Sequence, residues 1–270
     1  MKILVLGDVM GSSGRTALKK NYSKIVKEYE IDFSVINGEN SADDGKGITK
    51  KIADELFSLG IDVITSGNHI WDKEETTKFI EKETRLLRPA NLVKGSPGRG
   101  YGIYFSKNKK YKIGVINLMG NVFMKKTEDV FTAAKKFLDK VKLKRDVDFI
   151  IVDIHAEITS EKMAMAYLFD GKATLVFGTH THVPTSDHRI MEKGTAYQTD
   201  LGMSGDYNSV IGMNKDNSLK KFLKDSSAEN HFPALGEATI SGLLVTADDK
   251  TGLAKKVQPI ILGGSLQERV

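Results

Sequence analysis

The sequence predicts an α/β fold in which two mixed β-sheets pack face to face and carry helices on their outer sides. Within the first 85 of the 270 residues, short apolar runs alternate three times with helical stretches, which is typical of βαβ units with right-handed crossovers. From Arg189 onward the chain again favours β-strands, so both halves contribute strands. The chain shows no internal repeat, low-complexity tract or linker, and we therefore expect one domain over residues 1–270.

The first part of the chain contains the three strand–helix repeats. Its opening residues are almost all apolar, as expected for a strand that is buried on both faces. A glycine-rich loop then leads to a helix with a regular apolar face, and Gly60 follows the second helix where a C-cap is expected. In chain order, we expect strand 2–6, helix 15–29, strand 33–36, helix 48–59, strand 62–65 and helix 73–83.

The pattern changes after residue 85. A hairpin is expected around the lysine-rich turn 107–110, and a helix with an apolar stripe follows it. Short apolar runs with turns between them make up most of the remainder. The expected elements are strands 102–105 and 112–117, a helix over 130–141, strand 149–154, helix 161–169, and strands 175–177, 189–191, 195–198, 239–246 and 256–262.

The composition excludes several classes of protein. The chain has no cysteine, which removes disulfides, cysteine-bound metal clusters and thiol nucleophiles, and it fits a reducing compartment. The first apolar run is too short for a signal peptide, and no uncharged apolar run approaches the ~18 residues of a membrane span. We therefore expect a cytoplasmic protein without a membrane partner. The net charge of +5 comes from lysines scattered over helical stretches, so stable nucleic-acid binding is not expected. The sequence leaves homo-oligomer formation open.

Polar side chains follow five of the predicted strands. The central example is Glu39, which follows a strand on a tight glycine turn and can therefore reach a ligand at the carboxyl edge of an α/β sheet. We expect all five strand ends to meet at one place. They are Gly7-Asp8, Gly38-Glu39-Asn40, Gly67-Asn68-His69, Asp153-Ile154-His155 and Gly178-Thr179-His180-Thr181-His182.

These strand ends carry the side chains that bind transition metals. Carboxylate and amide oxygens bind hard cations, and imidazole binds borderline ones, so the set suits Fe, Mn or Zn alike. Seven ligands are too many for one tetrahedral ion, but they suit two divalent ions about 3.5–4 Å apart that share a carboxylate. The candidate ligands are Asp8, Glu39, Asn40, Asn68, His155, His180 and His182.

The single motifs differ in how specifically they indicate a metal site. His180 and His182 are two residues apart, and if both lie on a strand they share one face. Asp8 alone also fits a cap or turn residue, and His155 alone fits a hydrogen-bonded core histidine. The joint occurrence therefore carries the metal-site hypothesis. His188 and His231 lack this context, and we interpret both as ordinary residues.

Two neighbours of the third strand end have alternative interpretations. Asp72 either orients the ring of His69 or forms the N-cap of helix 73–83, and the cap is favoured. Trp71 either stacks on a nucleotide base or belongs to the core or a lid. Both are therefore weak candidates for substrate binding.

The order of these motifs resembles the calcineurin-like metallophosphoesterase family. It is most similar to the YmdB-like branch of bacterial phosphodiesterases, through the segments that include 7–11, 37–40, 67–72 and 202–213. The larger family usually has Asp-x-His in its first motif and Gly-Asp in its second. Here Met10 replaces that histidine, and Glu39-Asn40 stands in the second motif, as in the YmdB-like branch.

The resemblance implies a four-layer αββα sandwich and a division of the ligands between two ions. Asp8, Asn40 and His182 would hold the first ion, Asn68, His155 and His180 the second, and Glu39 would bridge them. Members of the branch bind iron or manganese and hydrolyse cyclic nucleotides, including 2′,3′-cyclic ones. The mechanism we expect is attack of a metal-bridging hydroxide on phosphorus, with His69 as the general acid for the leaving oxygen.

Three other functions are alternatives to this hypothesis. A metal-dependent nuclease would use the same chemistry on RNA or DNA, but it would need a long basic groove. A regulatory nucleotide-binding protein would use the metals only structurally. A dinucleotide-binding enzyme is suggested by Gly11-Ser12-Ser13-Gly14, but this loop matches neither G-x-G-x-x-G nor the P-loop with its lysine.

Overall fold

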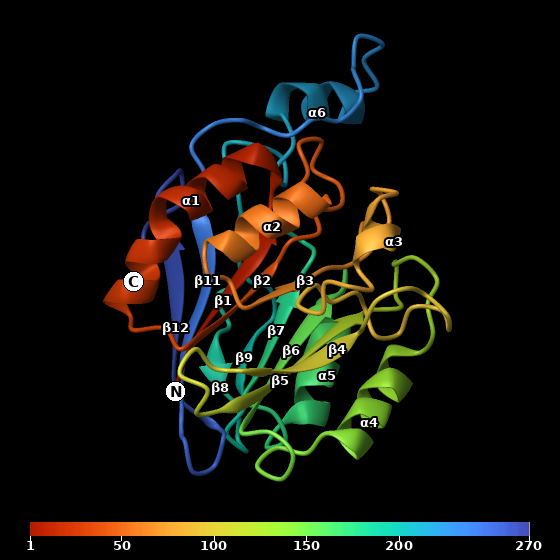
Figure 1. Cartoon of the computed structure of the whole chain (residues 1–270). Helices are drawn as coiled ribbons and strands as arrows, with labels where there is room; N and C mark the ends of the chain where they lie inside the picture. The colour runs from red at the N-terminus through yellow and green to blue at the C-terminus, as the bar shows by residue number, and fades with distance from the viewer. Residues whose placement is uncertain (270) are drawn as a thin grey trace.

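The computed structural model describes residues 1–269 and contains two six-stranded sheets that face each other (Figure 1). The first sheet has the strand order β12-β11-β1-β2-β3, with β10 beside β1, and the second has the order β4-β5-β6-β7-β9-β8. The first contains β1 (Lys2–Val9), β2 (Phe33–Asn37), β3 (Val63–Thr65), β10 (Met203–Ser204), β11 (Ile240–Ala247) and β12 (Ala254–Leu262). The second contains β4 (Tyr101–Phe105), β5 (Lys112–Met119), β6 (Phe149–His155), β7 (Leu175–Thr179), β8 (Arg189–Ile190) and β9 (Ala196–Gln198).

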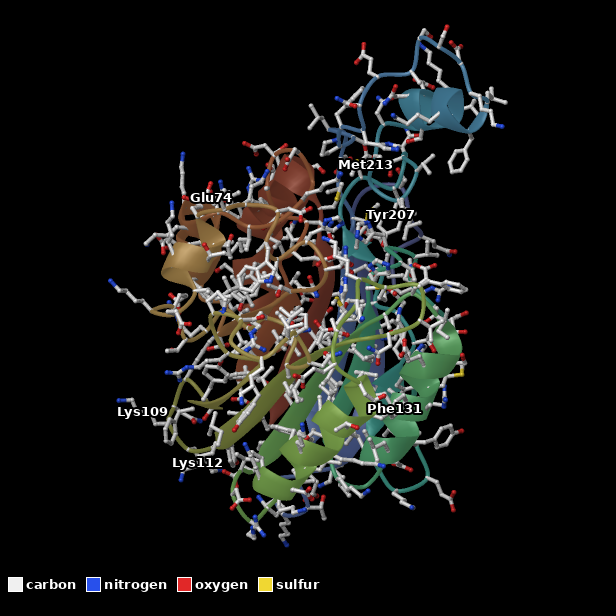
Figure 2. The ribbon with its side chains drawn as sticks, turned by 90° about the vertical axis from the view of Figure 1, so that its right-hand side faces the viewer. Glu74, Lys109, Lys112, Phe131, Tyr207 and Met213 are labelled. Carbon is white, nitrogen blue, oxygen red and sulfur yellow. The ribbon has the colours of Figure 1, made fainter. Side chains whose placement is uncertain are left out.

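The longer helices cover the outer faces of the sheets. Hydrophobic residues of α1 and α2 pack on the first sheet, and those of α4 and α5 pack on the second. Figure 1 shows α6 projecting from the body, joined to the sheets by a segment in which Figure 2 labels Tyr207 and Met213. The helices are α1 (Gly11–Glu28), α2 (Lys50–Ser58), α3 (Thr76–Phe79), α4 (Val130–Lys140), α5 (Thr159–Phe169) and α6 (Lys215–Phe222).

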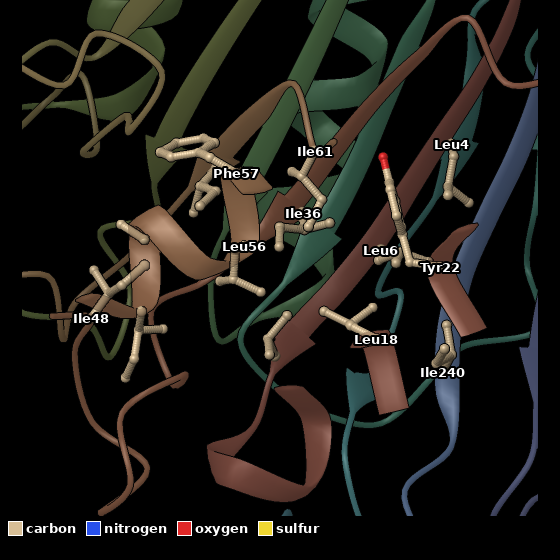
Figure 3. Close-up of a cluster of buried hydrophobic side chains, with 14 of the residues drawn as sticks. Leu4, Leu6, Leu18, Tyr22, Ile36, Ile48, Leu56, Phe57, Ile61 and Ile240 are labelled. Atoms are coloured by element: carbon tan, nitrogen blue, oxygen red, sulfur yellow. The ribbon is translucent and has the colours of Figure 1, made fainter. Parts of the chain in front are cut away.

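Three hydrophobic layers hold these elements together, and β1 shows how. Because successive strand residues point to opposite faces, Leu4 and Leu6 pack against the helices, while Ile3 and Val5 pack between the two sheets. Figure 3 shows the first of these layers. A third cluster lies between the second sheet and its helices. The predicted four-layer αββα sandwich is therefore confirmed.

The direction of the strands places their polar ends together. In the first sheet β1, β2 and β3 are parallel, and in the second β5, β6, β7 and β9 are parallel. The carboxyl ends of parallel strands lie at the same edge of a sheet, where α/β proteins bind ligands. None of the helices among residues 1–269 is long and apolar enough to cross a membrane.

The structure corrects several predicted boundaries. The first strand continues through Asp8 to Val9, because Asp8 pairs in parallel with Met203 of β10, almost 200 residues away. The first helix accordingly begins at Gly11 instead of at residue 15. The helix predicted over 73–83 is reduced to the single turn of α3, and α6 was not predicted. Long-range pairing and turn contacts decided these boundaries, and neither leaves a periodic pattern in the sequence.

Candidate metal centre

Glu39 lies at the centre of the candidate site and is 1% exposed. Its Oε1 lies 2.8 Å from Nε2 of His155, and its Oε2 accepts a hydrogen bond from the backbone N–H of His69 at 3.0 Å. Ligand atoms of Glu39, His155 and His180 all lie within 4.8 Å of one another. One buried carboxylate thus joins residues from β6 and from the loops after β2, β3 and β7.

The remaining candidate ligands lie on two sides of this carboxylate. On one side, Nε2 of His155 lies 3.1 Å from both Oδ1 of Asn68 and Nδ1 of His180. On the other side, Nε2 of His182 lies 3.3 Å from Oδ1 of Asn40 and 3.9 Å from Oδ1 of Asp8. The structure therefore brings together all seven residues that the sequence singled out, at the carboxyl edge of both sheets.

Each histidine is held through the ring nitrogen that faces away from the site. His182 donates from Nδ1 to the carbonyl oxygen of Ile211 at 2.8 Å, and Nε2 of His180 lies 3.1 Å from a carboxylate oxygen of Glu157. His155 contacts the Thr179 hydroxyl through Nδ1 at 2.9 Å. Such partners fix the ring and its tautomer in metal sites, because the opposite nitrogen then offers a lone pair.

The residues present fit a divalent cation. Three imidazole nitrogens, two amide oxygens and two carboxylates face one small region, and Oδ1 of Asp8 is fully buried there without a hydrogen-bond partner in the described chain. So many acceptors around a buried point require a positive charge. Imidazole, amide and carboxylate together are the donor set of Fe, Mn and Zn sites.

The pKa shifts agree with a site built for positive charge. Burial raises the pKa of the Asp8 carboxyl. Burial also acts to lower the pKa of His155, but the adjacent Glu39 carboxylate outweighs this effect and raises it. Burial and the charge of His155 together lower the pKa of His180 to about 3. Protein groups alone thus place the positive charge on His155, and a metal ion would supply that charge instead.

The two histidines after β7 reach the site in a different way from the one predicted. The strand ends at Thr179, so His180 and His182 do not share a strand face. They lie in a turn in which His180 has φ 102° and His182 has φ 65°. Non-glycine residues adopt this left-handed region only where other contacts hold them. His180 lies beside Glu39 and His182 beside Asp8, but the expectation that they share a strand face was wrong.

A buried ion pair that the sequence did not reveal holds this turn. Oδ2 of Asp200 accepts hydrogen bonds from both the backbone N–H and the hydroxyl of Thr181, at 3.1 and 2.8 Å. The same oxygen binds Nζ of Lys162 at 2.7 Å, and both charged side chains are buried. Lys162 lies near the start of the helix predicted over 161–169, and a lysine in a helix is usually exposed to solvent, so the sequence gives no sign of its burial. Glu157, the partner of His180, lies two residues after His155 and so was close to a motif that the sequence analysis identified.

His69 and Asp72 form a pair at the edge of the site. Nδ1 of His69 lies 2.7 Å from Oδ2 of Asp72, and both side chains are about a quarter exposed. The favoured interpretation of Asp72 as a helix N-cap was wrong, because α3 begins only at Thr76 and its N-cap residue is Glu75. Trp71 packs against the core cluster between the first sheet and its helices. Neither His188 nor His231 has a contact with the seven clustered residues in the described chain.

Gly67 leaves room for the site, which provides a test of its packing. A Cβ atom at this position would lie 2.2 Å from Nε2 of His155 and 2.5 Å from Oε2 of Glu39. We expect Gly67→Ala to displace both side chains, to lower stability by about 1–3 kcal/mol and to reduce metal content. Urea denaturation and elemental analysis check this prediction. Gly114→Ala is the matched control, because its Cβ would meet only ordinary contacts from 3.6 Å outward. Equal metal content in Gly67→Ala and wild type would contradict the geometry.

The fold and the site define the class of the protein. Two facing sheets with candidate metal ligands at their carboxyl edges are the architecture of metallophosphoesterase-type enzymes. The structure of a 5′-nucleotidase from Candida albicans shares this fold, with a TM-score of 0.53 over 96% of this chain and 50% of the other, at 12% identity.

The chain belongs to the YmdB-like family, whose model, described as "YmdB-like protein", matches residues 4–260. It is 42% identical to the 2′,3′-cyclic-nucleotide 2′-phosphodiesterase of Bacillus subtilis over 97% of both chains. A solved structure described as a novel phosphatase from Mycoplasma pneumoniae superposes with a TM-score of 0.88 at 37% identity, over 97% of this chain and 93% of the other. The chain is accordingly a hydrolytic phosphoesterase, as the sequence predicted.

Proposed function

We propose that the protein is a two-metal phosphodiesterase that hydrolyses cyclic nucleotides, with 2′,3′-cyclic nucleotides preferred. The observation that carries this proposal is the convergence of seven donor groups around the buried Glu39 carboxylate. The substrate class is supported by the name of the Bacillus subtilis relative. Residues 1–270 would act as one domain, because strands of both sheets lead to candidate ligands. We propose that this domain acts in the cytoplasm.

The ligands would divide between two ions along the two sides of Glu39. Asp8, Asn40 and His182 would hold one ion, while Asn68, His155 and His180 would hold the other, and Glu39 would contact both. Iron and manganese are our first candidates, and zinc also suits these donors. When bound, such ions polarise phosphoryl oxygens and make hydroxide available near neutral pH.

The chain's own residues would bind and orient the substrate and move one proton. A water-derived hydroxide adds to phosphorus in line with the ribose O2′, the P–O2′ bond breaks, and His69 protonates O2′ from Nε2. Asp72 holds the opposite nitrogen of His69 at 2.7 Å, which keeps Nε2 turned away from it. The backbone N–H of His69 donates a hydrogen bond to Oε2 of Glu39, and this contact fixes the position of the general acid relative to the shared carboxylate.

The test combines metal analysis with a substrate panel. Purified protein should contain close to two transition-metal ions per chain and should hydrolyse 2′,3′-cyclic AMP faster than 3′,5′-cyclic AMP or a short RNA. Chelation should abolish turnover, and adding back Mn²⁺ should restore it. A preference for RNA would make the protein a nuclease instead. Two bound ions without turnover of any diester would favour the regulatory binding protein and overturn our proposal.

A further inference from the structure

A buried carboxylate that the proposed chemistry does not use lies behind His155. Asp153 is fully buried on β6, two residues before His155. Its Oδ1 accepts a hydrogen bond from the Thr179 hydroxyl at 2.8 Å. Its Oδ2 accepts from the Thr65 hydroxyl at 2.5 Å and from Nδ2 of Asn37 at 3.1 Å. Three donors therefore hold this side chain in one position.

The hydroxyl of Thr179 connects Asp153 to the ring of His155. A threonine hydroxyl has one proton to donate. In the described chain, Oδ1 of Asp153 receives a hydrogen bond from Thr179 and from no other group, so that proton belongs between Thr179 and Asp153. The hydroxyl oxygen then accepts hydrogen bonds from Nδ2 of Asn37, at 3.3 Å, and from Nδ1–H of His155, at 2.9 Å. This direction leaves the lone pair of His155 on Nε2, which faces Glu39 and Asn68.

The same network joins the two sheets directly beneath the site. Asn37 and Thr65 end β2 and β3 of the first sheet, while Asp153 and Thr179 belong to β6 and β7 of the second. All four are fully buried. Turning the ring would break its contact with the Thr179 hydroxyl, which the hydrogen bonds between the two sheets hold in place.

We propose that Thr179 and Asp153 are positioning residues that fix the Nδ1–H tautomer and the ring orientation of His155, so that Nε2 faces the site before any ion binds. The inference rests on the proposed metal site, because it assigns these two residues a role toward the ion held by His155. It makes the affinity for that ion depend on a hydroxyl and a carboxylate that never touch it. Groups of this kind typically change metal affinity by 10–100-fold when they are removed.

The direct test replaces the Thr179 hydroxyl without changing its shape. Thr179→Val keeps the branched side chain and removes the acceptor, whereas Thr179→Ser keeps the hydroxyl. Zn²⁺ affinity of the full-length chain, measured by competition with a chromophoric chelator, should fall about 10–100-fold for one of two ions in Thr179→Val. The other ion should keep its affinity, and Thr179→Ser should stay within a few-fold of wild type.

A matched control separates positioning from loss of stability. Thr195 is a fully buried threonine of the second sheet region whose hydroxyl donates to the carbonyl oxygen of Ala173 at 2.7 Å, and it has no contact with a candidate ligand in the described chain. Thr195→Val should lower the melting temperature without changing Zn²⁺ affinity. If Thr195→Val weakens zinc as much as Thr179→Val does, or if Thr179→Ser fails as Thr179→Val does, the positioning role is overturned.

The tautomer provides a readout that does not depend on hydrolysis. ¹⁵N chemical shifts of His155 in the metal-free chain, at alkaline pH where the ring is neutral, should show the proton on Nδ1 in wild type and in Thr179→Ser. In Thr179→Val the ring proton should no longer be confined to Nδ1, and it should exchange with water. A proton on Nε2 in wild type, or an unchanged Nδ1–H in Thr179→Val, would overturn the inference even if the enzyme cleaves cyclic nucleotides. Tautomer control with two bound zinc ions but no diester turnover would instead overturn only the proposed function.

Asp153→Asn supplies a second variant on the same network. An amide retains one acceptor, but its NH₂ group would face a donor, either Nδ2 of Asn37 or the hydroxyl of Thr179. We expect this variant to weaken the same zinc ion as Thr179→Val, and the double variant to be little weaker than either single variant. Additive losses would show that the two residues act separately, which would contradict the proposed chain of contacts.

Discussion

Replacing Glu39 by glutamine should lower kcat/KM for 2′,3′-cyclic AMP by about 10³-fold, equivalent to roughly 4 kcal/mol of transition-state stabilisation. The substitution keeps the shape of the side chain and removes one negative charge from a fully enclosed position. If the amide NH₂ replaces Oε2, it meets the backbone N–H of His69; if it replaces Oε1, it points at Nε2 of His155. In either orientation one oxygen that would contact an ion is lost.

Metal content measured by elemental analysis should fall together with activity in Glu39→Gln. Glu28→Gln, on the exposed surface of α1, is the control and should retain both metals and full turnover. Both variants should remain folded. Circular dichroism, which reports the sheets and helices and not the site, checks this. Wild-type metal content together with wild-type turnover in Glu39→Gln would remove this carboxylate from the mechanism.

His69→Ala should retain both metals and lose about 10²–10⁴-fold in kcat, the range expected for a lost general acid. The imidazole is not counted among the seven ligand groups, and its ring is oriented by Asp72 at the edge of the site. The size of the loss should depend on the leaving group. A substrate with a nitrophenolate leaving group needs little protonation, so the variant should hydrolyse it almost as fast as wild type does.

His231→Ala is the matched control for this experiment, because His231 is exposed and has no contact with the site in the described chain. It should leave both substrates unaffected. Asp72→Asn should lose activity in the same direction as His69→Ala, but by less, since the ring remains present without its partner. Equal losses on ribose and nitrophenolate leaving groups would mean that His69 does not donate the proton.

Much of the fold could be predicted because its signals are local. The buried strands of the first sheet are continuous apolar runs, and α1, α2 and α4 have regular apolar faces, so periodicity alone located them. The family resemblance then supplied the four layers, which the facing sheets confirm. Helix α6 was not predicted, because its apolar residues remain exposed and it has no inward face to recognise. Phe222, for example, is 78% exposed.

Some residues of the candidate site could likewise be predicted from local sequence, whereas the roles of others depend on contacts in the folded chain. Asp8, Glu39 and His155 stand at strand ends that the sequence itself marks with glycines or apolar runs, so the types of ligand and their convergence could be predicted. Asp72 could not be interpreted correctly, because its choice between capping a helix and orienting His69 depended on where α3 begins.

The order of the residues along the chain indicates which chemical groups the strands carry to one edge: carboxylates, amides and imidazoles in an order that indicates a metal-dependent phosphoesterase. The direction in which those groups face follows from the packing of the folded chain. The turn that carries His180 and His182 is held by Asp200 and the buried Lys162, and the ring of His155 is held by Thr179. These are contacts between residues far apart in the chain, and their geometry is set by how the two sheets pack, which no local pattern encodes.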